Sequence, residues 1–106
     1  MTANNRARRY PRLGLPKGML VAWQCSGART VSRISTIGRG GIFIATGTPA
    51  RLGEIVRIAF DAPPGVVRAL GLVRDSKPGC GMGIEFTAMS PEGRASLDVL
   101  LHRLLQ

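Results

Sequence analysis

Short runs in which hydrophobic and polar residues alternate fill the middle of the chain, and segments rich in Gly, Pro, Ser or Thr separate them. This pattern predicts strands at Met19–Cys25, Ala28–Ser35, Gly41–Ala45, Glu54–Phe60, Val66–Arg74 and Gly81–Thr87. The links between these runs are short, which favours antiparallel pairing because a parallel crossover needs a dozen or more residues. Six such strands suit a small barrel, whose closure removes exposed sheet edges. We therefore expect an all-β fold, a six-stranded antiparallel barrel.

The period of the pattern changes near the C-terminus, where it predicts one helix. Ser90 is a good N-cap, Pro91 is favoured at the first helical position, and Glu92 complements the positive end of the helix dipole. An apolar face follows at helical spacing, formed by Leu97, Leu100, Leu101, Leu104 and Leu105. The polar side carries Arg94 and Asp98. Because the apolar face must be covered, the helix packs on the barrel or on a second subunit, which leaves a homodimer open.

The N-terminal segment has no such periodicity. Residues Met1–Arg12 are polar and basic, and we interpret them as a flexible arm before a domain that spans residues 13–106. The segment Leu13–Gly18 contains Pro16 and two glycines, so it reads as a turn-rich lead into the first strand.

Charge is distributed unevenly along the chain, which carries a formal net charge of +9. All six acidic residues lie from Glu54 onwards, where six basic residues balance them. The nine basic residues before Glu54 have no acidic counterpart, so the first half of the chain should attract phosphate-bearing partners. Most of them are Arg, whose planar guanidinium binds phosphates and guanine edges in bidentate fashion.

The sharpest cationic motif lies in the arm, where Arg8, Arg9 and Arg12 surround Tyr10 and Pro11. Pro11 disfavours a helical conformation at Tyr10 and holds the stretch extended or turned. Arginines four residues apart on a bent arm could converge on one anion from two sides. The alternative is a disordered basic tail that binds nothing in particular.

A second motif, Thr36–Gly41, reads as a Gly-rich link between two predicted strands. Its glycines would let backbone N–H groups approach a ligand, while Thr36 offers a hydroxyl and Arg39 a guanidinium. The alternative is a simple turn without a ligand.

These two motifs and the strand Gly81–Phe86 together resemble the PilZ domain, a bacterial receptor module for cyclic di-GMP. The family has an Arg-x-x-x-Arg arm, an Asp/Asn-x-Ser-x-x-Gly motif and a Gly-x-Gly-hydrophobic-x-Phe strand that leads to a C-terminal helix. The matching positions, in that order, are Arg8 and Arg12; Thr36, Gly38 and Gly41; and Gly81, Gly83 and Phe86. The resemblance spans nearly the whole chain and implies the same barrel with a terminal helix.

The resemblance also implies a ligand site on the outer barrel face. Cyclic di-GMP would contact Arg8, Arg9, Arg12, Thr36, Gly38, Arg39 and Gly41. The second motif departs from the family, because Thr36 replaces Asp or Asn and Gly38 replaces Ser. Two polar side-chain contacts are therefore altered or lost, which should weaken binding.

These features lead to three hypotheses for function. The first is a cytoplasmic receptor that binds cyclic di-GMP, orders its Arg-rich arm and acts on a separate downstream protein. The second is an interaction-only PilZ-like protein that no longer binds the dinucleotide. The third is a small basic barrel for RNA or single-stranded DNA, which we do not expect because the five aromatic residues fall mostly in predicted core strands.

Catalysis and membrane insertion are not expected. The sequence has no carboxylate pair, His–Cys cluster or Ser–His–Asp set that suggests an enzyme, a metal site or a cofactor other than the dinucleotide ligand. No apolar run approaches the length of a membrane span.

Overall fold

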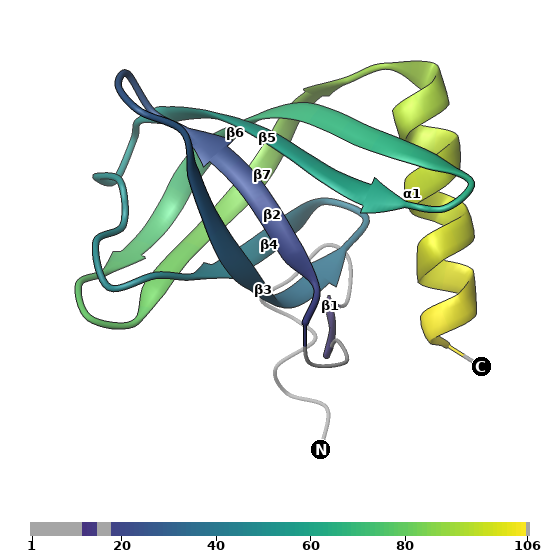
Figure 1. Cartoon of the computed structure of the whole chain (residues 1–106), viewed down its shortest axis with the longest axis horizontal. Helices are drawn as coiled ribbons and strands as arrows, with labels where there is room; N and C mark the ends of the chain where they lie inside the picture. The colour runs from purple at the N-terminus through teal and green to yellow at the C-terminus, as the bar shows by residue number, and fades with distance from the viewer. Residues whose placement is uncertain (1–11, 15–17, 106) are drawn as a thin grey trace.

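The computed structural model describes residues 12–14, of which only the backbone is considered, and residues 18–105 (Figure 1). This part of the chain contains seven strands followed by one helix. The elements are β1 (Arg12–Gly14), β2 (Leu20–Gln24), β3 (Thr30–Gly38), β4 (Gly41–Ala45), β5 (Ile55–Ala62), β6 (Gly65–Lys77), β7 (Gly81–Met89) and α1 (Pro91–Leu104).

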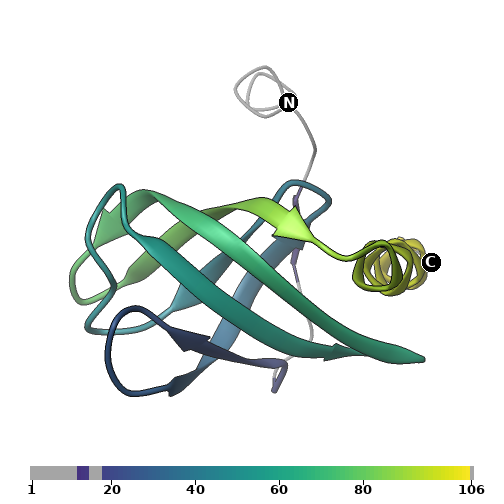
Figure 2. The same cartoon turned by 90° about the horizontal axis from the view of Figure 1, so that it is seen from above.

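Six of these strands form a closed antiparallel barrel, as the alternation predicts. The strands pair in the order β3-β2-β5-β6-β7-β4, and β4 pairs with β3 again to close the ring. Figure 2 shows the molecule from above, with α1 seen along its axis beside the barrel. In this order β2 lies between β3 and β5, and β6 and β7 lie between β5 and β4.

The strand boundaries differ from the predicted ones mainly at their ends. Gly41–Ala45 is found as predicted, because turn residues flank it on both sides. By contrast, β6 extends over Gly65–Lys77, since its ladders with β5 and β7 reach the turns at both ends. Side-chain support at one end comes from Ser76, whose hydroxyl donates to the Ala50 carbonyl over 2.7 Å.

The prediction of a turn-rich segment at Leu13–Gly18 is partly wrong. Leu13 and Gly14 do not form a turn but belong, with Arg12, to strand β1. This strand pairs with residues 36–38 of β3, whereas β2 pairs with residues 30–33 of the same strand. The backbone groups of β3 beyond the end of β2 thus find partners in β1, which satisfies hydrogen-bonding groups that burial would otherwise leave unpaired.

The core fills the barrel with alternate residues of each strand. On β5, for example, Val56, Ile58, Phe60 and Ala62 point inward and are almost fully buried. The intervening side chains of β5 face outward, as the period of two along a strand requires. None of the described polar or charged residues is buried, so the core is entirely apolar.

Helix α1 begins and packs as its sequence predicts. The Ser90 hydroxyl accepts a hydrogen bond from the Gly93 N–H at 3.0 Å, the N-cap contact that satisfies one free helix donor. Leu97 and Leu100 are buried against the barrel, chiefly on β6, while Leu105 lies after the last turn and is 71% exposed. The barrel of the same chain therefore covers the centre of the apolar face, while Leu101 and Leu104 are partly buried. No helix in the described residues has the length and apolarity needed to cross a membrane.

Candidate functional site

The residues predicted to bind the ligand come from three neighbouring elements at one end of β3. Arg12 lies in β1, Thr36 and Gly38 close β3, and Gly41 opens β4. Arg8 and Arg9 lie outside the described residues, so their role as ligand contacts stays a prediction.

The register between β1 and β3 brings the first two motifs together. Arg12 is paired with Gly38, and Gly14 is paired with Thr36. The backbone of Arg12, the second Arg of the Arg-x-x-x-Arg motif, thus lies beside the backbone of Gly38, where the family carries Ser. Sequence separation alone gives no hint of this, because 26 positions separate the two residues in the chain.

The link between β3 and β4 is shorter than predicted. Thr36 and Gly38 belong to β3 and Gly41 to β4, so only Arg39 and Gly40 remain in the turn. The described glycines with a positive φ are Gly18, Gly53 and Gly79, and none of them lies in this motif. The Gly40 carbonyl accepts a hydrogen bond of 2.9 Å from the Phe86 N–H, which fixes the turn to β7.

Arg39 itself is held by helix α1. Its Nε lies 3.1 Å from Oδ1 of Asp98, and an Nη atom of Arg94 donates to the Arg39 carbonyl over 2.7 Å. Arg94 and Asp98, four residues apart on the polar side of the helix, both contact the β3–β4 turn. Since the Arg39 and Asp98 side chains are about half exposed, a ligand anion could compete with Asp98 for Arg39.

The third motif contributes close packing rather than ligand atoms. A Cβ added to Gly81 would collide with the Ile44 carbonyl and come within 2.7 Å of the Phe43 ring. Gly83 is buried and lies opposite Phe43 in the β4–β7 ladder. The glycines of this motif therefore make room for Phe43, and Phe86 packs against the core.

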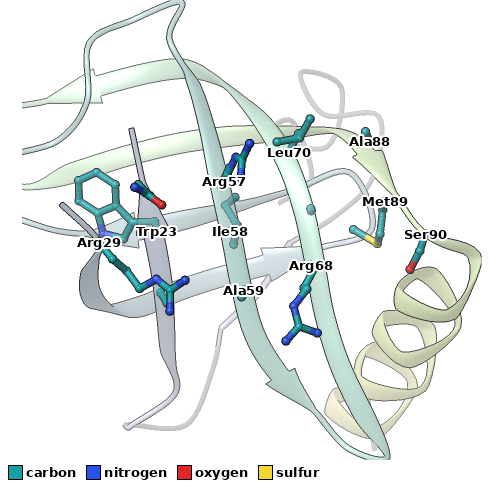
Figure 3. Close-up of a pocket in the computed structure, with 13 residues that line it drawn as sticks. Trp23, Arg29, Arg57, Ile58, Ala59, Arg68, Leu70, Ala88, Met89 and Ser90 are labelled. Carbon is teal, nitrogen blue, oxygen red and sulfur yellow. The ribbon is translucent and has the colours of Figure 1, made fainter. Parts of the chain in front are cut away.

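Sequence reasoning missed a basic hollow on the opposite wall of the barrel. It has a volume of about 570 Å³ and is lined by residues of β2, β5, β6 and the end of β7, with Arg29, Arg57 and Arg68 among them (Figure 3). The only available signal was the alternation of Arg57 and Arg68 with buried residues, which places both outward but does not bring them together.

The described residues offer little for catalysis. No group of three or more His, Cys, Asp or Glu side chains within them could hold a metal ion. Cys25 and Cys80 are both free thiols. Partial burial and the nearby Glu54 carboxylate raise the pKa of the Cys25 thiol, which disfavours the nucleophilic thiolate.

Comparison with solved structures identifies the fold. The PilZ domain of YcgR from Escherichia coli, solved with c-di-GMP, is 18% identical with a TM-score of 0.71; the match covers 92% of this chain and 91% of that one. The PilZ domain of CeSA from a cellulose-synthesizing bacterium is 17% identical with a TM-score of 0.67, covering 91% of this chain and 99% of that one.

A longer protein shares the same fold. The Bacillus subtilis inhibitor of motility MotI (DgrA) is 21% identical with a TM-score of 0.69, over 92% of this chain and 51% of that one. The chain thus spans about half the length of MotI. No curated protein matches the sequence significantly. The family model of the PilZ domain matches residues 6–103, which include all three motifs, and the chain therefore belongs to the PilZ domain family.

Proposed function

We propose that this PilZ domain is a non-enzymatic receptor that binds cyclic di-GMP at the junction of β1, β3 and β4. The observation that carries this proposal is the pairing of Arg12 with Gly38, which joins the Arg-x-x-x-Arg motif to the β3–β4 motif. The structure of the related E. coli domain contains c-di-GMP, which makes this dinucleotide the first ligand to test.

The expected affinity is reduced by the two changes in the second motif. Thr36 keeps a hydroxyl where the family has Asp or Asn, but Gly38 offers only backbone groups. If each lost contact is worth ~1–1.5 kcal/mol, both together weaken binding by roughly 30- to 150-fold. Each remaining charge-assisted contact from the arginines contributes about 1.5–3 kcal/mol, which supports measurable binding.

The signal would pass through the Arg-rich arm. Binding of the dinucleotide would bring Arg8, Arg9 and Arg12 onto one anion, so the arm orders on the ligand and presents a new surface to a downstream protein. Amide exchange across residues 6–11, which precede β1, should then slow at saturating ligand, while the Leu97–Leu104 part of α1 stays protected throughout. Unchanged amide exchange across these residues at saturating ligand would contradict the arm mechanism. It would leave the proposal that the domain binds cyclic di-GMP intact.

The second candidate is a protein that interacts with partners but no longer binds the dinucleotide. Besides Thr36 and Gly38, the ion pair between Arg39 and Asp98 favours this reading, because it occupies one of the predicted ligand contacts.

Titration calorimetry with the full chain separates these candidates. The receptor proposal predicts saturable heat with cyclic di-GMP and a weaker response to linear diguanylate, which lacks the closed ring. A single-stranded oligonucleotide, titrated at several salt concentrations, serves as comparator. Absence of binding to cyclic di-GMP at high micromolar concentrations would favour the interaction-only protein, and tight, salt-dependent oligonucleotide binding would favour a nucleic-acid module.

A further inference from the structure

Outward side chains on one wall of the barrel form two continuous rows, because the strand registers align them. We call these two rows the basic wall; they are Val31–Ala22–Ala59–Arg68 across β3, β2, β5 and β6, and Gln24–Arg57–Leu70–Ala88 across β2, β5, β6 and β7. Because β5 is separated from β3 and β4 in the barrel order, the centre of this wall faces away from the Thr36–Gly41 motif.

The basic wall is hollowed where its side chains are small. Ala22 and Ala59 lie opposite each other on β2 and β5, at the floor of the cavity of about 570 Å³. In the view of Figure 3, Ala59 lies between Arg29, at the β2–β3 hairpin, and Arg68 on β6. The hollow therefore combines an apolar floor with cationic sides.

The positive charge of this wall is not neutralised within the part of the chain that the structure describes. Arg29, Arg57 and Arg68 are exposed and make neither an ion pair nor a side-chain hydrogen bond among those residues. The acidic residues on the strands of this wall are Asp61 on β5, Asp75 on β6 and Glu85 on β7. Asp75 is already paired with Lys77 over 3.6 Å, and Glu85 with Arg74 over 2.7 Å. Three guanidinium groups are thus available to an external anion.

Exposed apolar side chains extend the wall beyond the hollow. Val31 is 61% exposed, Leu20 on β2 is 55% exposed, and Val66 and Leu70 on β6 are each 40% exposed. Several exposed apolar side chains on one wall of a folded domain are typical of an interaction surface. These side chains are spread over three strands, β2, β3 and β6, and such an extent fits a polypeptide segment better than a small molecule.

The positive charge of the basic wall and the burial of the Trp23 ring indicate the kind of partner. A second copy of the chain, joined through the same face, would set these arginines against one another. Single-stranded nucleic acid would need exposed aromatic rings, but Trp23 at this site is only 7% exposed, and its Nε1–H donates to Ser32 Oγ over 3.0 Å. A polypeptide with alternating carboxylate and apolar side chains satisfies both features of the wall.

We propose that the basic wall binds an acidic segment of another protein. Its carboxylates pair with Arg29, Arg57 and Arg68, and its apolar side chains cover the hollow and Leu70. This surface is separate from the junction of β1, β3 and β4, so partner binding here does not require that the dinucleotide site be intact.

Chemical shifts of the isotope-labelled full chain, titrated with a short capped peptide of alternating Glu and Leu, test this proposal. Saturable shifts should cluster at the amides of Ala22, Arg57, Ala59, Arg68 and Leu70, and a Gln-Leu peptide should not produce them. The double variant Arg57→Gln/Arg68→Gln should weaken peptide binding about tenfold. Arg51→Gln, which removes an exposed charge from the β4–β5 loop, should bind like the parent.

Three outcomes would overturn the proposal. Shifts scattered over the whole basic surface, or equal binding by the double variant and Arg51→Gln, would mean nonspecific attraction. Tighter saturation of the same amides by an oligothymidylate would mean a nucleic-acid surface. Sedimentation that shows a dimer lost in the double variant would assign the wall to self-association.

Discussion

Arg39 Nε and Asp98 Oδ1 lie 3.1 Å apart, and this ion pair joins the β3–β4 turn to helix α1. The second contact between the same elements, from Arg94 to the Arg39 carbonyl, holds the turn from its backbone side. Because Arg39 is one of the predicted ligand contacts, Asp98 would compete with the phosphates of a dinucleotide bound at the proposed site. Helix α1 is thereby joined to the β3–β4 turn by one side-chain ion pair and one hydrogen bond to the backbone.

Replacing this carboxylate should release Arg39 for the ligand. We expect Asp98→Asn to raise affinity for cyclic di-GMP by up to about fivefold, since an exposed ion pair is worth about 0.2–1 kcal/mol. Stability should fall by no more than the same amount. Calorimetry and urea denaturation measure the two effects.

Glu92→Gln is the matched control for that variant. It makes the same change in net charge on the same helix, in the first turn and without a described contact to Arg39. An equal gain in affinity for cyclic di-GMP in both variants would mean that the change in net charge alone causes the effect. A loss of affinity in Asp98→Asn would show that the carboxylate supports ligand binding.

Restoring the second motif should strengthen ligand binding. The double change Thr36→Asp with Gly38→Ser replaces the side chains that the family uses, so a gain of about tenfold or more is expected from one or two recovered hydrogen bonds. Gly38 lies in β3 and is not among the glycines with positive φ, so serine meets no conformational penalty there. A folded double variant with unchanged affinity would argue against this register of the motif.

Gly81 should tolerate no side chain. Gly81→Ala would push a methyl group into the Ile44 carbonyl, a backbone group that cannot move aside, and we expect a loss of about 1–3 kcal/mol in unfolding free energy. Gly47→Ala is the control, because a Cβ there meets nothing within 4 Å. Urea denaturation of both variants checks the difference; equal stability would remove the packing explanation for the Gly81-x-Gly83 pattern.

The barrel was predictable because its information is local. Alternation predicts a strand at Gly41–Ala45, and the turn residues on both sides predict its ends. Ser90 and Pro91 predict where the helix begins. Strand β1 was missed since three residues carry no period, and only pairing with β3 makes them a strand.

The site was less predictable because its geometry depends on distant residues. Arg39 and Asp98 are 59 positions apart, so no local pattern links them. The same holds for the basic wall, where Arg29, Arg57 and Arg68 come from different elements and line one hollow only in the folded barrel. The resemblance to the family named residues of the first two motifs as one proposed site, and the structure places Arg12, Thr36, Gly38 and Gly41 in neighbouring strands.

The most direct test of ligand binding at this junction is calorimetry of cyclic di-GMP with variants that differ only in which arginine is lost. We predict that Arg8→Ala and Arg12→Ala each abolish the binding heat of the parent while their melting temperatures stay nearly unchanged. Arg51→Ala, which removes an equal charge outside the junction, should bind like the parent. Full binding by Arg8→Ala and Arg12→Ala, or equal weakening in all three variants, would contradict the proposed site.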